Sequence, residues 1–199
     1  DRQIGNPAYA VATRSLDILV SVAILGLLWW LLLAMWLAVR ITSPGPGIFA
    51  QTRIGRGGRP FTCLKFRTMA EGTRQAGTHE VSEASVTPIG RVLRRTKIDE
   101  LPQAWNVLKG EMSLVGPRPE RPEFVQRLAE QIPYYEERHR VKPGLSGWAQ
   151  IRYPYGASAE DGLEKLQYDL YYVKNYSILL DALILLQTAE VVLLGRGAH

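Results

Sequence analysis

Cysteine and histidine are nearly absent from this chain. Among 199 residues there is one cysteine, Cys63, so no internal disulfide can form and the fold does not depend on an oxidising compartment. The three histidines, His79, His139 and His199, are scattered and lack the short spacings of metal ligands. These two shortages exclude a disulfide-stapled domain and a zinc site built from histidine and cysteine.

Acidic residues are missing from a long stretch near the N-terminus. No aspartate or glutamate occurs between Asp17 and Glu71. Over the whole chain, 24 lysines and arginines outnumber 19 acidic residues, which gives a formal net charge of +5. Such an excess indicates an anionic partner: nucleic acid, a lipid surface or a phosphorylated substrate. The basic residues inside the gap are Arg40, Arg53, Arg56, Arg59, Lys65 and Arg67.

Charge of either sign is absent from residues 18–39, ILVSVAILGLLWWLLLAMWLAV. A helix of this length extends about 33 Å, close to the hydrocarbon thickness of a bilayer. The run is too long for a signal peptide and lacks the polar stripe of a core helix. Residues 1–42 are therefore predicted to insert into a membrane, and residues 43–199 to form a separate folded domain. Trp29 and Trp30 lie mid-run, where a spanning helix rarely carries tryptophan, so spanning and re-entry both stay open.

The second domain is predicted to be α+β, mostly helical with one small antiparallel β-hairpin. The segments IFAQTRI and RPFTCLKFRTM flank a GRGG turn, a pattern typical of a hairpin. In the second strand Cys63, Lys65 and Arg67 alternate with Leu64 and Phe66. Side chains alternate between the faces of a strand, so one face is predicted to be basic and the other to enter the core.

The first helix of this domain is predicted to begin at Thr87 and Pro88, where a hydroxyl cap precedes proline in the first turn. Its apolar face is predicted to consist of Ile89, Val92 and Leu93. A short helix should follow from about Pro102 to Leu108, closed by Gly110. A further helix is expected over residues 123–140, with an interruption at Pro133.

Two polar stretches are predicted to be loops: residues 70–86, which look mobile, and residues 142–150, which are rich in turn formers. Near the C-terminus, Leu163, Leu166, Leu170 and Val173 recur at helical spacing and are predicted to be core. The last apolar helix, residues 177–195, carries Asp181, Gln187 and Glu190, so it is predicted to lie along the membrane or in the core rather than to span.

An acidic pair, Asp99 and Glu100, ends a basic run and precedes Pro102. The simple interpretation is a helix cap. However, a helix N-terminus favours phosphate, and Arg94, Lys97, Arg118, Lys65 and Arg67 lie in nearby segments. Together these cations suit a diphosphate, and a carboxylate among them suits Mg²⁺. A carboxylate is also a competent nucleophile at phosphorus.

Four motifs resemble the bacterial sugar transferase family, the monotopic phosphoglycosyl transferases. They are KFRTM (65–69), KIDELPQAWNVLKGEMSLVGPRP (97–119), KPGLSGWAQ (142–150) and YDLYYVKNYSILLD (168–181). The resemblance covers nearly the whole chain, with the motifs in the expected order and at the expected separations. GPRPERPEF and the GRGA ending look most like members that start exopolysaccharide synthesis. The chain begins at Asp1, so it is interpreted as a catalytic domain from a longer protein.

The resemblance implies transfer of a sugar 1-phosphate from a UDP-sugar to polyprenyl (undecaprenyl) phosphate, with release of UMP. Asp99 falls on the family's nucleophile, which forms a covalent phosphosugar intermediate, and on its Mg²⁺ ligand. Glu100 falls on the partner that orients Asp99 or assists proton transfer. Arg94 and Arg118 match phosphate-binding arginines, and Lys65 and Arg67 match a basic strand that also contacts phosphate.

The resemblance further implies a bacterial inner membrane protein with its catalytic domain on the cytoplasmic face and with interfacial amphipathic helices. Members usually carry Ser-Pro midway along a re-entrant membrane helix, where this chain has Trp29-Trp30. Re-entry is favoured on the resemblance. Membrane lipid is an expected partner, oligomer formation stays open, and nucleic acid is not expected because the basic strand offers no aromatic platform.

Two alternatives explain part of the sequence. A non-enzymatic membrane scaffold would use the basic face to bind anionic lipids, but it gives no reason for the acidic pair. A conventional glycosyltransferase would release UDP where the proposed enzyme releases UMP.

Overall fold

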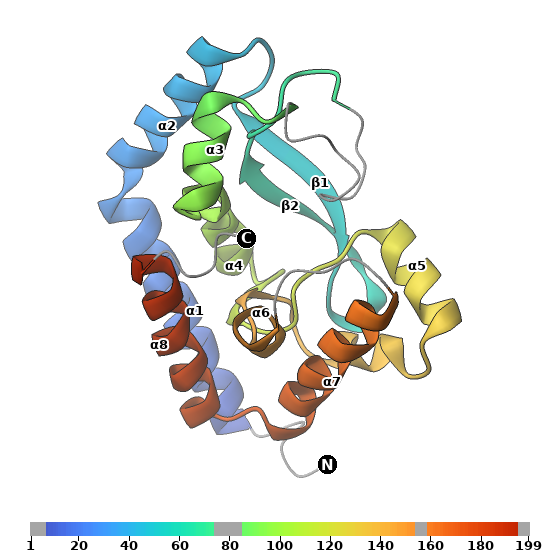
Figure 1. Ribbon diagram of the computed structural model, residues 1–199. Coiled ribbons are helices and arrows are strands. Elements are labelled where there is room, and N and C mark those ends of the chain that lie inside the picture. The colour runs from blue at the N-terminus through green and yellow to red at the C-terminus, as the bar shows by residue number, and fades with distance from the viewer. Residues whose placement is uncertain (1–6, 74–84, 154–158, 195–199) are drawn as a thin grey trace.

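The computed structural model describes residues 7–73, 85–153 and 159–194 (Figure 1). The chain is predominantly helical, with a two-stranded antiparallel sheet and a two-stranded parallel sheet. This confirms the predicted α+β class. Most of the predicted loop over residues 70–86 and the GRGA ending lie outside the described residues.

The apolar N-terminal segment forms two helices, α1 (Pro7–Leu27) and α2 (Trp29–Thr42), instead of one uninterrupted helix. The break is at Leu28, whose φ of −104° and ψ of 13° leave the helical region. Hydrogen bonds from Leu28 N to Ile24 O (3.0 Å) and from Leu32 N to Leu28 O (2.9 Å) persist, so the axis bends without ending. The break immediately precedes the tryptophan pair and needs no proline. By length and composition, α1 alone among the described helices is long and apolar enough to cross a bilayer.

The hairpin is formed by β1 (Ile48–Ile54) and β2 (Pro60–Phe66), with Ile48 opposite Phe66. Its turn uses positive φ at Gly57 (67°) and Gly58 (74°), which a residue with a Cβ adopts only under strain. The prediction of one basic and one buried face was partly wrong. Cys63 and Phe66, on opposite faces of β2, are both buried, because β2 has core packing on each side.

Two short helices follow the hairpin. Helix α3 (Pro88–Arg95) begins as predicted, with Thr87 Oγ1 accepting from Gly90 N at 3.0 Å. Helix α4 (Gln103–Lys109) ends at Gly110, whose φ of 85° is the left-handed cap expected of glycine. The predicted apolar face of α3 is correct for Leu93 but wrong for Val92, which is 55% exposed because it points away from the core.

The prediction for residues 123–140 is confirmed: α5 (Pro122–Gln131) ends before Pro133 and a 3₁₀ helix, η4 (Tyr135–Arg140), follows. The prediction of a loop over residues 142–150 was wrong. This segment contains β4 (Gly144–Ser146), which pairs in parallel with β3 (Ser113–Val115), and the start of α6 (Trp148–Arg152). Because each strand has three residues and the two are far apart in sequence, no local pattern marks the pair.

The C-terminal helices are α7 (Ala159–Asn175) and α8 (Ile178–Leu194). On α7, Leu166 and Val173 are buried as predicted, whereas Leu163 is exposed. Helix α8 lies alongside α1 (Figure 1), and a buried carboxylate joins them: Asp181 accepts from Tyr9 Oη at 2.6 Å and from Tyr172 Oη at 2.8 Å. These bonds explain how an acidic residue sits in an otherwise apolar helix.

Two polar side chains on α1, Arg14 and Asp17, form hydrogen bonds to α4 and β3. Arg14 donates to Val107 O (2.7 Å) and Leu108 O (2.6 Å) at the C-terminal end of α4. Asp17 accepts from Leu114 N (2.8 Å) and Ser113 Oγ (3.0 Å) at β3. In its packing, α1 belongs to the same hydrophobic core as α4 and β3. The predicted boundary at residue 42 concerns membrane insertion, which packing does not test, so it stays a prediction.

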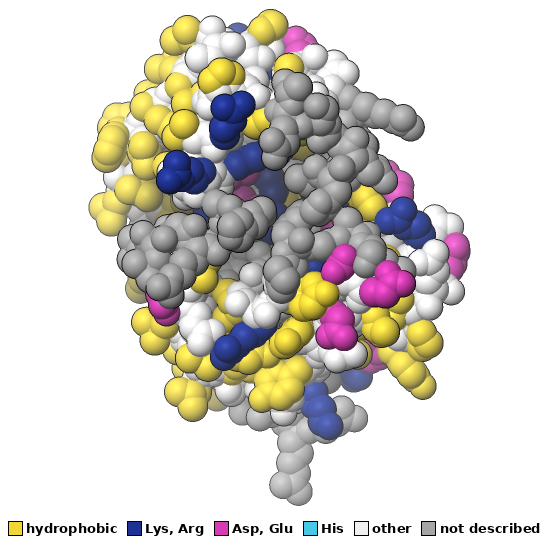
Figure 2. All heavy atoms as spheres, viewed as in Figure 1, with side chains coloured by type: hydrophobic (Ala, Val, Ile, Leu, Met, Phe, Trp, Pro, Cys, Tyr) yellow, Lys and Arg dark blue, Asp and Glu magenta, His cyan; other side chains and the backbone are white. Residues whose placement is uncertain are grey.

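Large apolar side chains remain exposed along α1, α2 and α8, and they form a yellow margin in the space-filling view (Figure 2). Basic side chains gather beside this margin, over α3 (Figure 2). An apolar rim therefore lies next to a basic patch, and a contiguous exposed apolar surface of this kind is typical of an interaction site. The exposed apolar side chains include Leu19, Leu27, Trp29, Trp30, Ile41, Leu179 and Leu186.

Candidate active site

The acidic pair lies on a single 3₁₀ turn, η3 (Ile98–Glu100), between α3 and α4. The turn starts at Lys97, which adopts a left-handed conformation (φ 58°) uncommon for a residue with a side chain. Pro102 is the N-cap residue of α4, so the pair precedes a helix start as the sequence predicts. Neither carboxylate accepts a cap hydrogen bond at that helix, and the simple capping interpretation is not supported.

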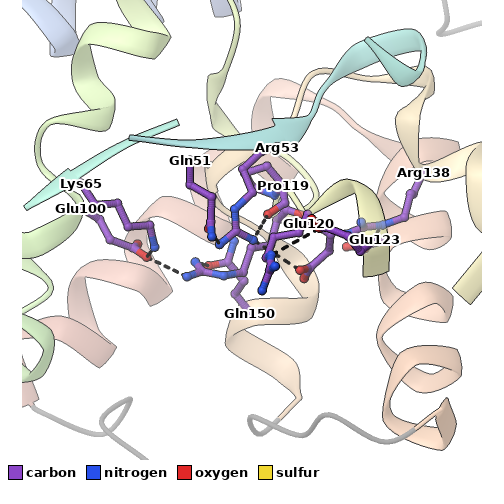
Figure 3. Close-up of polar contacts among 12 residues, drawn as sticks. Gln51, Arg53, Lys65, Glu100, Pro119, Glu120, Glu123, Arg138 and Gln150 are labelled. Atoms are coloured by element: carbon purple, nitrogen blue, oxygen red, sulfur yellow. Dashed lines mark hydrogen bonds and ion pairs between the residues drawn. The ribbon is translucent and has the colours of Figure 1, made fainter. Parts of the chain in front are cut away.

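Glu100 is held by two cations from different parts of the fold (Figure 3). Its Oε1 accepts from Lys65 Nζ and from Arg118 Nη2, both at 2.7 Å. Burial alone would raise the pKa of Glu100, but Arg118 and Lys65 hold it well below its ordinary value. Glu100 is therefore ionised across the physiological range, and it fixes the two cations relative to the turn.

Asp99 has a different environment on the same turn. It is 8% exposed, and its Oδ1 is buried without a hydrogen-bond partner among the described residues. Burial raises the pKa of Asp99, the Glu100 charge adds to this, and Lys65 and Arg118 oppose it. A buried carboxylate oxygen without a donor is costly unless something else binds it, which marks this atom as available for a ligand.

The position of Arg118 is set by the β3–β4 pair and by a buried ion pair. Gly116 N donates to Ser146 O at 2.9 Å, and a Cβ at Gly116 would lie 2.3 Å from Lys142 O, so only glycine allows this approach. Arg138 donates to Arg118 O at 2.8 Å and to Asp169 Oδ2 at 2.7 and 2.9 Å. The Arg118 backbone is thus held by a hydrogen bond from the buried Arg138 side chain.

Asn106 fixes Lys65 in a similar way. Its side chain is fully buried on α4, accepts from Leu64 N at 3.1 Å and donates to Thr62 O at 2.7 Å. The amide therefore binds the free edge of β2 next to Lys65, as another strand would. Sequence reasoning missed Asn106 and the Arg138–Asp169 pair. The available signal for Asn106 was a polar residue between apolar ones in a short helix.

The other two predicted phosphate-binding residues are Arg94, on α3, and Arg67, directly after the end of β2. Arg94 donates from Nε to Thr68 Oγ1 at 2.9 Å, just beyond the end of β2. Arg67 is buried and donates to Ser43 O at 2.7 Å and to Pro44 O, in the linker after α2. Its phosphate contact stays a prediction, while the structure gives this guanidinium a role in closing the linker.

The predicted Mg²⁺ site is compatible with the donors present. Among the described residues there is no cluster of three or more His, Cys, Asp or Glu side chains that would enclose a metal ion. Magnesium is, however, commonly bound by one or two carboxylates completed by substrate phosphates and water. The unpartnered Asp99 oxygen suits this open kind of site, whereas Glu100 is already bound by two cations.

Comparison with known proteins gives a consistent result. The family model for bacterial sugar transferases matches residues 8–195. A UDP-N-acetylgalactosamine-undecaprenyl-phosphate N-acetylgalactosaminephosphotransferase of Aeromonas hydrophila is 44% identical, over 100% of this chain and 48% of the relative. A UDP-glucose:undecaprenyl-phosphate glucose-1-phosphate transferase of Xanthomonas campestris pv. campestris is 41% identical, over 96% of this chain and 41% of the relative.

A third relative, an undecaprenyl-phosphate galactose phosphotransferase of Salmonella typhimurium, is 35% identical, over 94% of this chain and 41% of the relative. The chain therefore spans less than half the length of these three relatives. Their names differ in the sugar and agree in undecaprenyl phosphate.

Proposed function

Because the chain belongs to the bacterial sugar transferase family, we propose that it transfers a sugar 1-phosphate from a UDP-sugar to polyprenyl phosphate. The names of its relatives support this reaction class. The observation that carries the proposal is the turn at residues 98–100. There one carboxylate is bound by two cations from distant segments, while its neighbour keeps a buried oxygen that has no partner in the described part of the chain.

In the proposed first step, an oxygen of the Asp99 carboxylate attacks the phosphorus that bears the sugar. A phosphorus–oxygen bond to Asp99 forms, the bond to the bridging oxygen breaks, and UMP leaves with that electron pair. Lys65 and Arg118 neutralise charge that builds up on the phosphoryl oxygens. Mg²⁺ bound at Asp99 would reduce the repulsion between an anionic nucleophile and an anionic diphosphate.

In the proposed second step, an oxygen of polyprenyl phosphate attacks the same phosphorus and breaks its bond to Asp99. The products are polyprenyl-diphosphate-sugar and the regenerated carboxylate. Of the two roles expected for Glu100, the geometry favours the organising one. A carboxylate that accepts from Lys65 and Arg118 is a poor proton acceptor, but it holds both cations next to Asp99.

The lipid acceptor accounts for the apolar margin formed by α1, α2 and α8. We propose that this margin rests in the cytoplasmic leaflet of the bacterial inner membrane, with α1 and α2 re-entering on the side from which they came. The bend at Leu28 supports re-entry, because it changes the direction of the helix axis in the middle of the apolar segment. The reaction would be the first membrane step of exopolysaccharide or other glycoconjugate synthesis.

The proposal is tested with a panel of UDP-sugars, polyprenyl phosphate and Mg²⁺, by measuring nucleotide release. We expect UMP with at least one donor, whereas release of UDP would contradict the proposal. Asp99→Asn should reduce turnover by about a thousandfold or more and should no longer trap a labelled phosphosugar, because the amide is not a nucleophile. The control is Glu164→Gln, a neutralisation on the exposed face of α7 that should keep normal activity.

A further inference from the structure

The side chain of Gln150, on α6, has a fixed orientation and an unused donor. Its Oε1 accepts from Arg118 Nη1 at 3.1 Å. Arginine only donates, so the atom that faces it must be the amide oxygen, and the NH₂ group is the other branch of the amide. That nitrogen, Nε2, is buried and has no acceptor among the described residues.

The surroundings hold this amide in place. A Cβ at Gly147 would lie 3.3 Å from Gln150 Nε2 and 2.3 Å from Gly116 O, so the loops after β3 and β4 meet here backbone to backbone. The amide cannot turn over without losing its bond to Arg118. Leaving a buried N–H unpaired is unfavourable, and few native groups do so without a reason.

Two unpaired polar atoms therefore flank one ion pair. Arg118 binds Gln150 through Nη1 and Glu100 through Nη2. Two atoms next to this pair have no partner among the residues that the structure describes: Oδ1 of Asp99, which precedes Glu100 in the chain, and Nε2 of Gln150, which contacts Arg118. A ligand that offers both a cation or donor and a hydrogen-bond acceptor would satisfy both atoms.

We propose that Gln150 Nε2 donates a hydrogen bond to a phosphoryl oxygen of the reacting substrate, beside the guanidinium of Arg118. This inference rests on the proposed function and adds a substrate-binding residue to it. A phosphoryl oxygen is the acceptor that suits the place, since Arg118 and Lys65 already concentrate positive charge on this side of Glu100. A neutral amide adds a donor with a fixed direction and leaves the charge of the site unchanged.

The test compares the chain with Gln150→Glu, Gln150→Met and Gln167→Glu, all in lipid nanodiscs. Glutamate at position 150 keeps an oxygen towards Arg118 and replaces the NH₂ by an oxygen that repels phosphate. Methionine keeps the length and removes both polar atoms. Gln167 is exposed on α7, so its replacement by glutamate controls for the change in net charge.

We expect both Gln150 variants to weaken phosphate binding about tenfold or more, and the Gln167 variant to behave like the parent. The readouts are the Kd of UDP by calorimetry and the KM values of UDP-sugar and polyprenyl phosphate. A rise in the UDP Kd and the UDP-sugar KM assigns the phosphoryl oxygen to the nucleotide. A rise confined to the polyprenyl phosphate KM assigns it to the lipid.

Unchanged constants in a folded Gln150→Glu or Gln150→Met variant would overturn the inference and leave the proposed function intact. If the parent chain itself neither binds UDP nor releases UMP, the proposed function fails and this inference fails with it. Circular dichroism shows whether each variant is folded, and only the constants of a folded variant are compared with those of the parent.

Discussion

At the scale of single residues, the two carboxylates of the acidic pair are one position apart and differ in almost every physical respect. Glu100 accepts from two cations and has a lowered pKa, whereas Asp99 is buried beside it with a raised pKa and an oxygen that no described residue binds. Two titratable groups whose environments push their pKa values apart are a common basis for dividing roles within a site. The division proposed above, with Asp99 as nucleophile and Glu100 as organiser, is compatible with this difference.

Substitution of Arg118 distinguishes the transferase hypothesis from the hypothesis of a non-enzymatic, lipid-binding scaffold. Its two terminal nitrogens bind different partners, Gln150 and Glu100, which a single ammonium group cannot reproduce in the same geometry. We expect Arg118→Lys to lower kcat/KM about tenfold to a hundredfold, as lost charge-assisted hydrogen bonds would. Steady-state kinetics with UDP-sugar as the varied substrate measures the effect.

The same variant keeps its positive charge, so binding to vesicles that contain anionic lipid should stay the same as that of the parent chain. Flotation of both proteins with such vesicles is the control. Normal kinetics in Arg118→Lys would contradict a role for the two separate hydrogen bonds of this guanidinium.

At the scale of elements, the bend between α1 and α2 is the feature on which the proposed re-entry depends. The break at Leu28 divides the apolar segment into 21 and 14 residues, and the second piece is too short to cross a bilayer alone. The first piece is long enough, so sequence length by itself does not separate spanning from re-entry.

Cysteine labelling tests the topology with little background, because the single native cysteine, Cys63, is buried. Ala10 is exposed on α1, and we expect Ala10→Cys to react with an impermeant maleimide only when the cytoplasmic face is open. Gln167→Cys on the exposed face of α7 marks the catalytic side and should react under the same condition. Labelling of the residue 10 variant from outside intact cells would show instead that α1 spans.

At the scale of the whole molecule, the site depends on contacts between segments that are distant in sequence. Arg138 and Asp169 join η4 to α7, and their side chains are only 5% and 3% exposed. Removing one partner of a buried pair leaves the other charge without compensation. We therefore expect Asp169→Asn to lower the free energy of unfolding by about 3 kcal/mol or more, measured by denaturant unfolding in detergent.

The matched control is Glu137→Gln, which removes the partner of Arg140 in a pair whose side chains are each 47% exposed. Exposed pairs contribute less than about 1 kcal/mol, so this variant should unfold almost like the parent. Equal effects of the two substitutions would contradict a stabilising role for the buried pair.

Local features of this fold were predictable and long-range ones were not. Thr87 and Gly110 cap their helices through contacts within a few residues, so short motifs identify them. The pairing of Val115 with Ser146 and of Arg138 with Asp169 joins segments about 30 residues apart. Neither periodicity nor turn chemistry carries that information. The family resemblance identified Lys65, Glu100 and Arg118 as candidates, and the structure brings their side chains into contact, whereas the donor on Gln150 needed the geometry.

The contact between Arg14 and the last carbonyls of α4 makes that helix a spacer of fixed length. Helix α4 has seven residues, so about 10 Å of rigid rod separates the anchor on α1 from the turn that carries the acidic pair. A rod does not stretch when its surroundings change. With α1 in the bilayer as proposed, a bilayer of different thickness would therefore shift the height of the whole site relative to the lipid phosphates, while distances inside the site stay constant.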